Sequence, residues 1–148
     1  MHTVTRSLIL PYSAAEIYSL VDEIDRYRDF LPWCRDSIVL ERKCKEVTAQ
    51  IYVSFKGLNT AFTTRNFLLS EKKIKLELVD GPFDHMSGSW DFLSLDDRVC
   101  RVSLQVQFSL ASRLANQTIT PVFKYICNSL VESFAERAKQ LYGDRQLA

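Results

Sequence analysis

The sequence is poor in the residues that mark disordered and disulfide-rich proteins. Its 148 residues include only four glycines, four prolines and four cysteines. This scarcity excludes a collagen-like or low-complexity chain, and it is typical of one compact domain spanning residues 1–148. At this length, folding buries roughly 68–70% of the surface that the unfolded chain exposes, so the fold needs neither disulfides nor a metal ion for stability.

Long apolar runs and an excess of one charge are missing as well. No apolar stretch approaches bilayer-spanning length, and residues 1–7 lack the apolar segment of a secretory signal. The 19 basic and 18 acidic residues leave a net charge of +1, too small for a long-range field toward DNA or an anionic membrane. We therefore expect a cytoplasmic protein with no DNA partner and at most transient membrane contact.

The cysteines show no CxxC pair, and each lies in an apolar stretch or next to charged residues. Such cysteines are typical of reduced structural thiols in a cytosolic chain rather than of a disulfide framework. The four residues are Cys34, Cys44, Cys100 and Cys127.

Changes in hydrophobic period divide the chain into distinct elements. Residues 3–10 are predicted to form a strand. Ser13 and Glu16 form a capping box that begins a helix, and residues 25–30 predict a second short helix before Pro32. From residue 37 to 110 apolar and polar residues alternate, which indicates strands with one apolar face. Breaks near Cys44, at Gly57, and at residues 71–72, 80–82 and 96–97 separate six strands, whose short connections require antiparallel pairing.

The helical period returns after Leu110 and predicts a long C-terminal helix that ends at Gly143. Pro121 is expected in its first turns or at a kink. The apolar stripe of this helix consists of Val122, Phe123, Ile126, Leu130, Phe134, Ala138 and Leu141. Together the elements predict an α+β fold in which a curved seven-stranded antiparallel sheet surrounds the C-terminal helix, with two short helices after the first strand.

The widths of the sheet and the helix do not match. Seven strands about 4.8 Å apart make a sheet on the order of 30 Å wide, whereas a helix is about 10–12 Å across. The sheet must therefore curl around the helix, and the space between them is a candidate pocket for a hydrophobic ligand. The alternative is that large aromatic side chains fill the space, and both interpretations remain open.

Catalytic motifs are scarce. His2 lies at an N-terminus expected to fray, and His85 lies in an expected turn, residues 84–86, without a partner to fix its tautomer. Metal-binding HExxH, nucleophile-elbow and glycine-rich phosphate motifs are absent from the sequence. We therefore expect a protein that is not an enzyme, with no metal and no cofactor, although a general base at His85 is the alternative.

Two basic features each have two interpretations. Arg65 follows Phe62 in the same strand, so its guanidinium either faces the pocket and binds a polar ligand head or lies on the outer face beside a glutamate. Lys72, Lys73 and Lys75 either contact phosphates or form an ordinary solvated turn, since glutamates alternate with them.

Several segments together resemble the coenzyme Q-binding and polyketide-cyclase-like branch of the START superfamily, and they are most similar to its bacterial ribosome association toxins. The resemblance implies a helix-grip fold, in agreement with the periodicity. The matching segments occur in the expected order and spacing, and together they extend over nearly the whole chain. The segments are residues 10–14, 17–21, 30–34, 62–66, 78–83, 88–92 and 137–139.

The resemblance implies three candidate functions. The first is a non-catalytic protein that binds a polyprenyl quinone such as ubiquinone, or a similar lipid, and supports respiration. The second is a toxin that binds the large ribosomal subunit and blocks its joining with the small subunit. The third, with least support, is a cyclase-like enzyme. For a cavity ligand, the candidate binding residues are Trp33, Phe55, Phe62, Arg65, Phe83, Trp90, Phe92, Phe123, Ile126 and Leu130.

Overall fold

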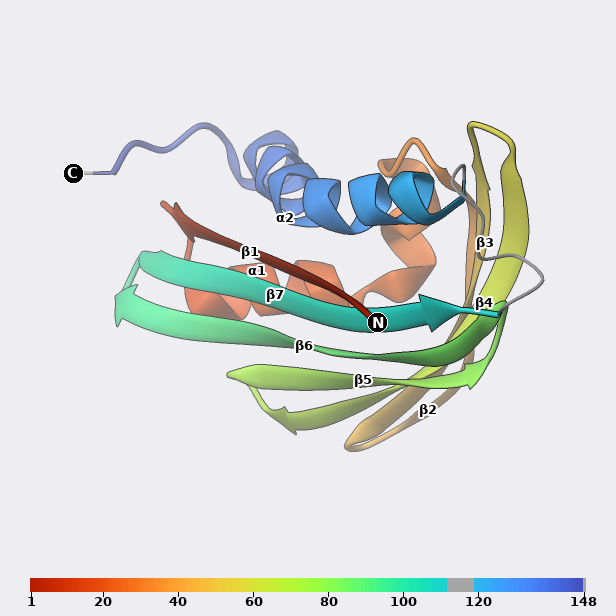
Figure 1. Ribbon diagram of the computed structural model, residues 1–148. Helices are drawn as coiled ribbons and strands as arrows, with labels where there is room; N and C mark the ends of the chain where they lie inside the picture. Colours follow the sequence, from red (N-terminus) through yellow and green to blue (C-terminus); the bar gives the residue numbers. More distant parts are fainter. Residues whose placement is uncertain (112–118, 148) are drawn as a thin grey trace.

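The computed structural model describes residues 1–111 and 119–147 and contains the predicted elements (Figure 1). The expected boundaries agree with the observed ones to within a few residues. The largest difference is β2, which begins at Cys34 rather than near residue 37. In chain order the elements are β1 His2–Leu10, α1 Ala14–Asp22, η1 Ile24–Asp29, β2 Cys34–Lys43, β3 Glu46–Phe55, β4 Leu58–Ser70, β5 Lys73–Asp80, β6 Phe83–Asp96, β7 Val99–Leu110 and α2 Ile119–Tyr142.

The strands form one antiparallel sheet in the order β1-β7-β6-β5-β4-β3-β2. Strands β2 to β7 follow one another as a meander, and β1 completes the sheet by pairing with β7, with Val4 opposite Val106. In Figure 1 the strands β2, β3 and β4 curl up beside α2, which lies across the concave face of the sheet. This arrangement confirms the predicted helix-grip fold.

Gly88 occupies a place in β6 where a side chain does not fit. It pairs with Leu76 of β5 and Val106 of β7. A Cβ atom added there would lie 2.5 Å from the carbonyl oxygen of Gln105. Glycine thus permits the close backbone approach of β6 and β7 in the middle of the curved sheet.

The predicted capping box begins α1. The backbone N–H of Glu16 donates to Ser13 Oγ at 3.1 Å, and the backbone N–H of Ser13 donates to Glu16 Oε1 at 2.9 Å. The second short helix, η1, is a 3-10 helix that follows directly. Both elements lie on the concave side of the sheet with α2 (Figure 1).

The C-terminal helix packs its apolar stripe on the sheet. Phe123, Ile126 and Phe134 are buried, and Pro121 is the third residue of α2, where its missing N–H costs no helical hydrogen bond. The expectation that Leu141 belongs to the buried stripe is wrong, because it is 51% exposed. It lies in the last turn of α2, where the ring of Tyr142 instead packs near that of Tyr12, 6.1 Å between centroids.

No helix in the described part of the chain is both long enough and apolar enough to span a bilayer.

Candidate functional site

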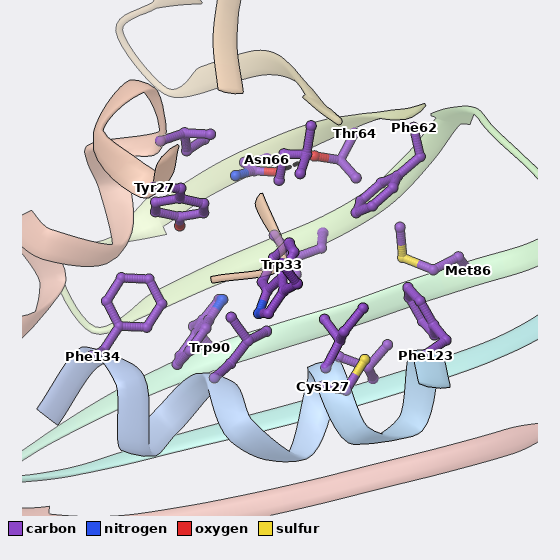
Figure 2. A pocket seen from close by; sticks show the side chains of 16 residues that line it. Tyr27, Trp33, Phe62, Thr64, Asn66, Met86, Trp90, Phe123, Cys127 and Phe134 are labelled. Carbon is purple, nitrogen blue, oxygen red and sulfur yellow. Dashed lines mark hydrogen bonds between the residues drawn. The ribbon is translucent and has the colours of Figure 1, made fainter. Parts of the chain in front are cut away.

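A cavity of about 90 Å³ lies between the concave face of the sheet and α2. Every strand from β3 to β7 contributes to its wall, together with η1, the segment before β2, and α2 (Figure 2). The curl of the sheet therefore leaves an internal space, as the width mismatch predicts. Side chains fill most of the interior, so the space that remains is small. Its lining residues are Ile24, Tyr27, Trp33, Ile51, Phe62, Thr64, Asn66, Leu76, Met86, Trp90, Val106, Phe123, Ile126, Cys127, Leu130 and Phe134.

Six of the ten residues predicted from the sequence line this cavity. Trp33 enters from the turn between η1 and β2, and the others come from the concave face of the sheet and from α2 (Figure 2). Their gathering from segments far apart in the sequence is a consequence of the helix-grip fold. The six are Trp33, Phe62, Trp90, Phe123, Ile126 and Leu130.

The structure places Arg65 outside the cavity. Its neighbours Thr64 and Asn66 are buried, whereas Arg65 is exposed and its Nε lies 3.0 Å from Glu46 Oε1. Side chains alternate between the two faces of a strand, so inward Thr64 and Asn66 direct Arg65 outward. The outer-face interpretation, with a glutamate partner, is the one observed.

Phe55, Phe83 and Phe92 also lie away from the lining of this cavity. Phe55 is the last residue of β3 and stacks on Tyr125 of α2, with 5.7 Å between ring centroids. Phe92 packs against Tyr18 of α1 at 5.3 Å, farther along β6 toward α1. Phe83 lines a neighbouring cavity.

The neighbouring cavity has a volume of about 190 Å³ and lies near the β3–β4 turn. Phe62 and Phe123 line both cavities, and the two rings lie 6.3 Å apart, edge to face. Phe83 packs on the same Phe123 ring at 5.0 Å. Phe62 and Phe123 thus lie between the two spaces, and Phe83 supports the Phe123 ring from the side of the second cavity.

Sequence reasoning missed the polar part of the cavity wall. Thr64 and Asn66 lie two and four residues after Phe62, so the period of the strand was sufficient to place them on the same face. Cys127 lies four residues after Phe123, at helical spacing, but a cysteine was interpreted only as a structural thiol. Tyr27, which lies in η1, is another lining residue that was not among the candidates.

Within the described part of the chain, no charged side chain and no histidine lines the cavity. Burial raises the pKa of the Cys127 thiol to about 12, so this cysteine is not a thiolate near neutral pH. Burial also raises the pKa of the Tyr27 hydroxyl, which donates to the carbonyl oxygen of Val21. The described lining thus offers apolar contact and neutral hydrogen-bonding groups.

The remaining sequence candidates lie at the surface. His85 belongs to strand β6, so the expected turn at residues 84–86 is wrong; its ring is exposed and lies 3.2 Å from Ser87 Oγ. Lys73 lies 3.6 Å from Asp91 and Lys75 lies 3.5 Å from Glu77, so carboxylates neutralise much of the predicted basic cluster. Among residues 1–111 and 119–147, no three His, Cys, Asp or Glu side chains converge as metal ligands would.

These features define a START-like helix-grip protein, with a curled antiparallel sheet around one long helix and an apolar cavity between them. The family model described as polyketide cyclase / dehydrase and lipid transport matches residues 10–135. The chain belongs to this family.

Individual relatives divide between different roles. A Pseudomonas aeruginosa protein named ribosome association toxin RatA is 39% identical over 95% of this chain and 97% of its own length. The Drosophila melanogaster mitochondrial coenzyme Q-binding protein COQ10 is 27% identical, over 94% of this chain and 59% of its own length. The crystal structure of the ZhuI aromatase/cyclase from Streptomyces has a TM-score of 0.81 at 18% identity over 97% of this chain and 99% of its own, which is a likeness of fold.

Proposed function

We propose that this protein binds the large ribosomal subunit in the cytoplasm and blocks its joining with the small subunit. The observation that carries this proposal is the 39% identity to a ribosome association toxin across nearly the full length of both chains. The quinone-binding relative is less similar, and the match covers 59% of its length. Ribosome binding, the second of the functions implied by the resemblance, is therefore better supported than quinone binding, the first.

The cavity also gives little support to a polyprenyl quinone as the ligand. Pockets for drug-sized molecules usually have volumes of about 300–1,000 Å³. The internal cavity has about 90 Å³. A polyprenyl chain would have to displace several of the aromatic side chains that now pack the interior.

The surface that we assign to the ribosome contact consists of Phe55, Lys56 and Tyr125, here called the aromatic–lysine surface. Tyr125 is 55% exposed although its ring stacks on Phe55 at an interplanar angle of 13°. Lys56 Nζ lies 5.4 Å from the centroid of Phe55 and 5.6 Å from that of Tyr125. An exposed aromatic face beside a cation fits an unpaired RNA base and its phosphate.

Lys56 occupies a backbone position that does not favour lysine. Lys56 and Gly57 form the two-residue turn between β3 and β4, with φ values of 46° and 85°. Such turns prefer Asn-Gly, because a side chain other than Gly, Asn or Asp costs roughly 1–2 kcal/mol at positive φ. The turn geometry does not explain a lysine here, whereas an electrostatic contact made by its ammonium group does.

The test is sedimentation of the purified protein with separated ribosomal subunits. We expect it to travel with the large subunit and to reduce the amount of joined ribosomes when small subunits are added. Tyr125→Ala should weaken this association by about 1–3 kcal/mol, the typical loss when a base-stacking ring is removed. Leu93→Ala is the control, since Leu93 is 53% exposed and lies on β6. Unchanged subunit joining at saturating protein would contradict the proposal.

A second candidate function is the binding of a small hydrophobic ligand in the internal cavity. The observation that favours it is the cavity itself, whose wall is almost entirely apolar. Apolar cavities of about 150 Å³ stay dry and take up benzene or xenon, and this one is smaller. Xenon is therefore a suitable probe, and shifts of methyl NMR signals confined to cavity residues are the expected result. An interior unaffected by xenon would contradict ligand binding.

A further inference from the structure

The cavity wall contains a hydrogen-bond donor without an acceptor. The side chain of Trp33 is 3% exposed, and within the described part of the chain its indole Nε1–H has no partner. Figure 2 shows the Trp33 ring in the middle of the lining side chains, with its nitrogen on the side of Trp90. Buried donors in folded proteins are nearly always paired, so an isolated one in a cavity wall indicates a missing acceptor.

Asn66 supplies a second donor to the same cavity. It is 6% exposed, and its Oδ1 accepts a hydrogen bond from Thr64 Oγ1 at 3.0 Å. This bond fixes the orientation of the amide, so the Nδ2 group points away from Thr64 (Figure 2). The hydrogen bonds of the described residues include no acceptor for Nδ2. The wall thus presents two side-chain N–H groups, those of Trp33 and Asn66, that have no acceptor among the described residues.

The charge of the cavity determines what kind of acceptor fits. Among residues 1–111 and 119–147, no Lys, Arg, His, Asp or Glu lines its wall. An anion placed there would be buried without a counter-ion, at a large cost in desolvation. The complementary ligand is therefore uncharged and carries an acceptor oxygen on a small apolar body.

We propose that the cavity binds a small uncharged carbonyl compound whose oxygen accepts a hydrogen bond from Trp33 Nε1 or from the Asn66 amide. The apolar body of the ligand packs against α2, where Phe123, Ile126 and Leu130 face the cavity. This inference rests on the second candidate function, ligand binding in the cavity. It adds the chemical class of the ligand and the residues that select it.

A matched pair of probes distinguishes ligand binding in general from recognition of a carbonyl oxygen. Cyclopentanone and methylenecyclopentane have nearly the same shape, and they differ in that the first carries a carbonyl oxygen where the second carries a CH₂ group. The sequence contains two tryptophans, which both line the cavity, so the two indole N–H signals in a ¹H–¹⁵N NMR spectrum report on its occupancy. We expect cyclopentanone, but not methylenecyclopentane, to shift one indole signal downfield, and Trp33→Phe to identify it as that of Trp33.

Affinities measured by titration then test the donors. In Trp33→Phe, or in Thr64→Val/Asn66→Leu, the affinity for cyclopentanone relative to methylenecyclopentane should fall about three- to tenfold, the effect of one neutral hydrogen bond. Leu93→Ala is the control, because Leu93 is exposed on β6 and is not among the residues that line the cavity. Unchanged affinity for the hydrocarbon shows that each variant keeps its cavity.

Each outcome has one meaning. If neither probe enters the cavity, ligand binding itself fails and the inference with it. If both probes bind but none of the donor variants changes their relative affinity, ligand binding stands and the carbonyl inference is overturned. A cavity that holds only ordered water, with the Trp33 signal unaffected by cyclopentanone, also overturns it.

Discussion

Glu16, in the first turn of α1, binds Arg145, which follows the C-terminal helix. Arg145 Nη1 donates to Glu16 Oε1 at 2.9 Å, and Nη2 donates to Oε2 at 3.1 Å. The guanidinium also lies 5.0 Å from the ring centroid of Tyr12, whose hydroxyl donates to the carbonyl oxygen of Gly143 at 2.7 Å. The beginning and the end of the chain are therefore joined beside α1 by a two-pronged ion pair and its neighbours.

Glu16→Gln separates this ion pair from the helix cap. Glutamine keeps the capping box, since either residue accepts the Ser13 N–H, but it loses the charge that Arg145 binds. We expect the free energy of unfolding to fall by about 0.5–1 kcal/mol, because both side chains are partly exposed. Glu16→Ala, which also removes the cap, should cost about 1 kcal/mol more. Unchanged stability in Glu16→Gln would show that the ion pair contributes nothing, and equal losses in the two variants would show that the cap contributes nothing.

The difference in stability between wild type and Glu16→Gln should depend on pH with a defined sign. The hydrogen bonds from Arg145, opposed by partial burial, lower the pKa of Glu16 below its ordinary value of 4.5. The stabilisation is therefore complete above that value and is lost as the pH falls through the lower pKa of the folded state. Urea unfolding of wild type and Glu16→Gln should differ at pH 7 and converge in acid. A difference that grows below pH 4 would contradict this assignment.

Local patterns in the sequence were sufficient to predict most of the fold. The capping box at Ser13 and the alternation from residue 37 to 110 determine the elements, because each depends on neighbouring residues alone. The pairing of β1 with β7 requires a contact between chain segments about 100 residues apart, and no local pattern specifies it.

The candidate site was less predictable, because a strand residue lines the cavity only if its side chain lies on the concave face of the sheet. Thr64, Arg65 and Asn66 illustrate this: alternation assigns Arg65 to the opposite face from its two neighbours, but only the curl of the sheet decides which face is inside. The size of the cavity depends on how aromatic rings such as Phe134 pack, which residue types alone do not fix. Trp33 lies in a turn and carries no periodic signal.

Lys56→Asn should increase stability while weakening ribosome association. Asparagine adopts positive φ at lower cost than lysine, but the variant loses the cation near Phe55 and Tyr125. We expect a net rise in the free energy of unfolding of about 0.5–1 kcal/mol. Affinity for the large subunit should fall and become less dependent on salt. Lys45→Asn, at an exposed lysine in the β2–β3 turn, is the control for net charge, and an equal loss of affinity there would argue against a local contact.

The four thiols should differ sharply in reactivity. Burial is the main cause that raises the pKa of Cys34 and of Cys100 to about 11 and that of Cys127 to about 12, whereas Cys44 is exposed. Since the thiolate is the reactive form, a disulfide reagent at pH 8 should modify one thiol per native chain and four after unfolding. Cys44→Ser should remove the fast reaction. Rapid modification of a second thiol would show that the interior opens readily to solvent.

Cys127→Leu tests whether the two proposed functions depend on each other. Cys127 lines the cavity from α2 and is 3% exposed, so a larger apolar side chain at this position fills part of the empty volume. We expect the free energy of unfolding to rise by about 0.5–1.5 kcal/mol, as cavity filling commonly does. Uptake of xenon and of cyclopentanone should be lost, as measured by NMR. Co-sedimentation with the large subunit should be unchanged, because the aromatic–lysine surface lies at the β3–β4 turn and on the exposed side of α2. If the folded variant instead loses ribosome association together with ligand uptake, the cavity and the ribosome contact act as one coupled site, and their treatment as independent functions is wrong.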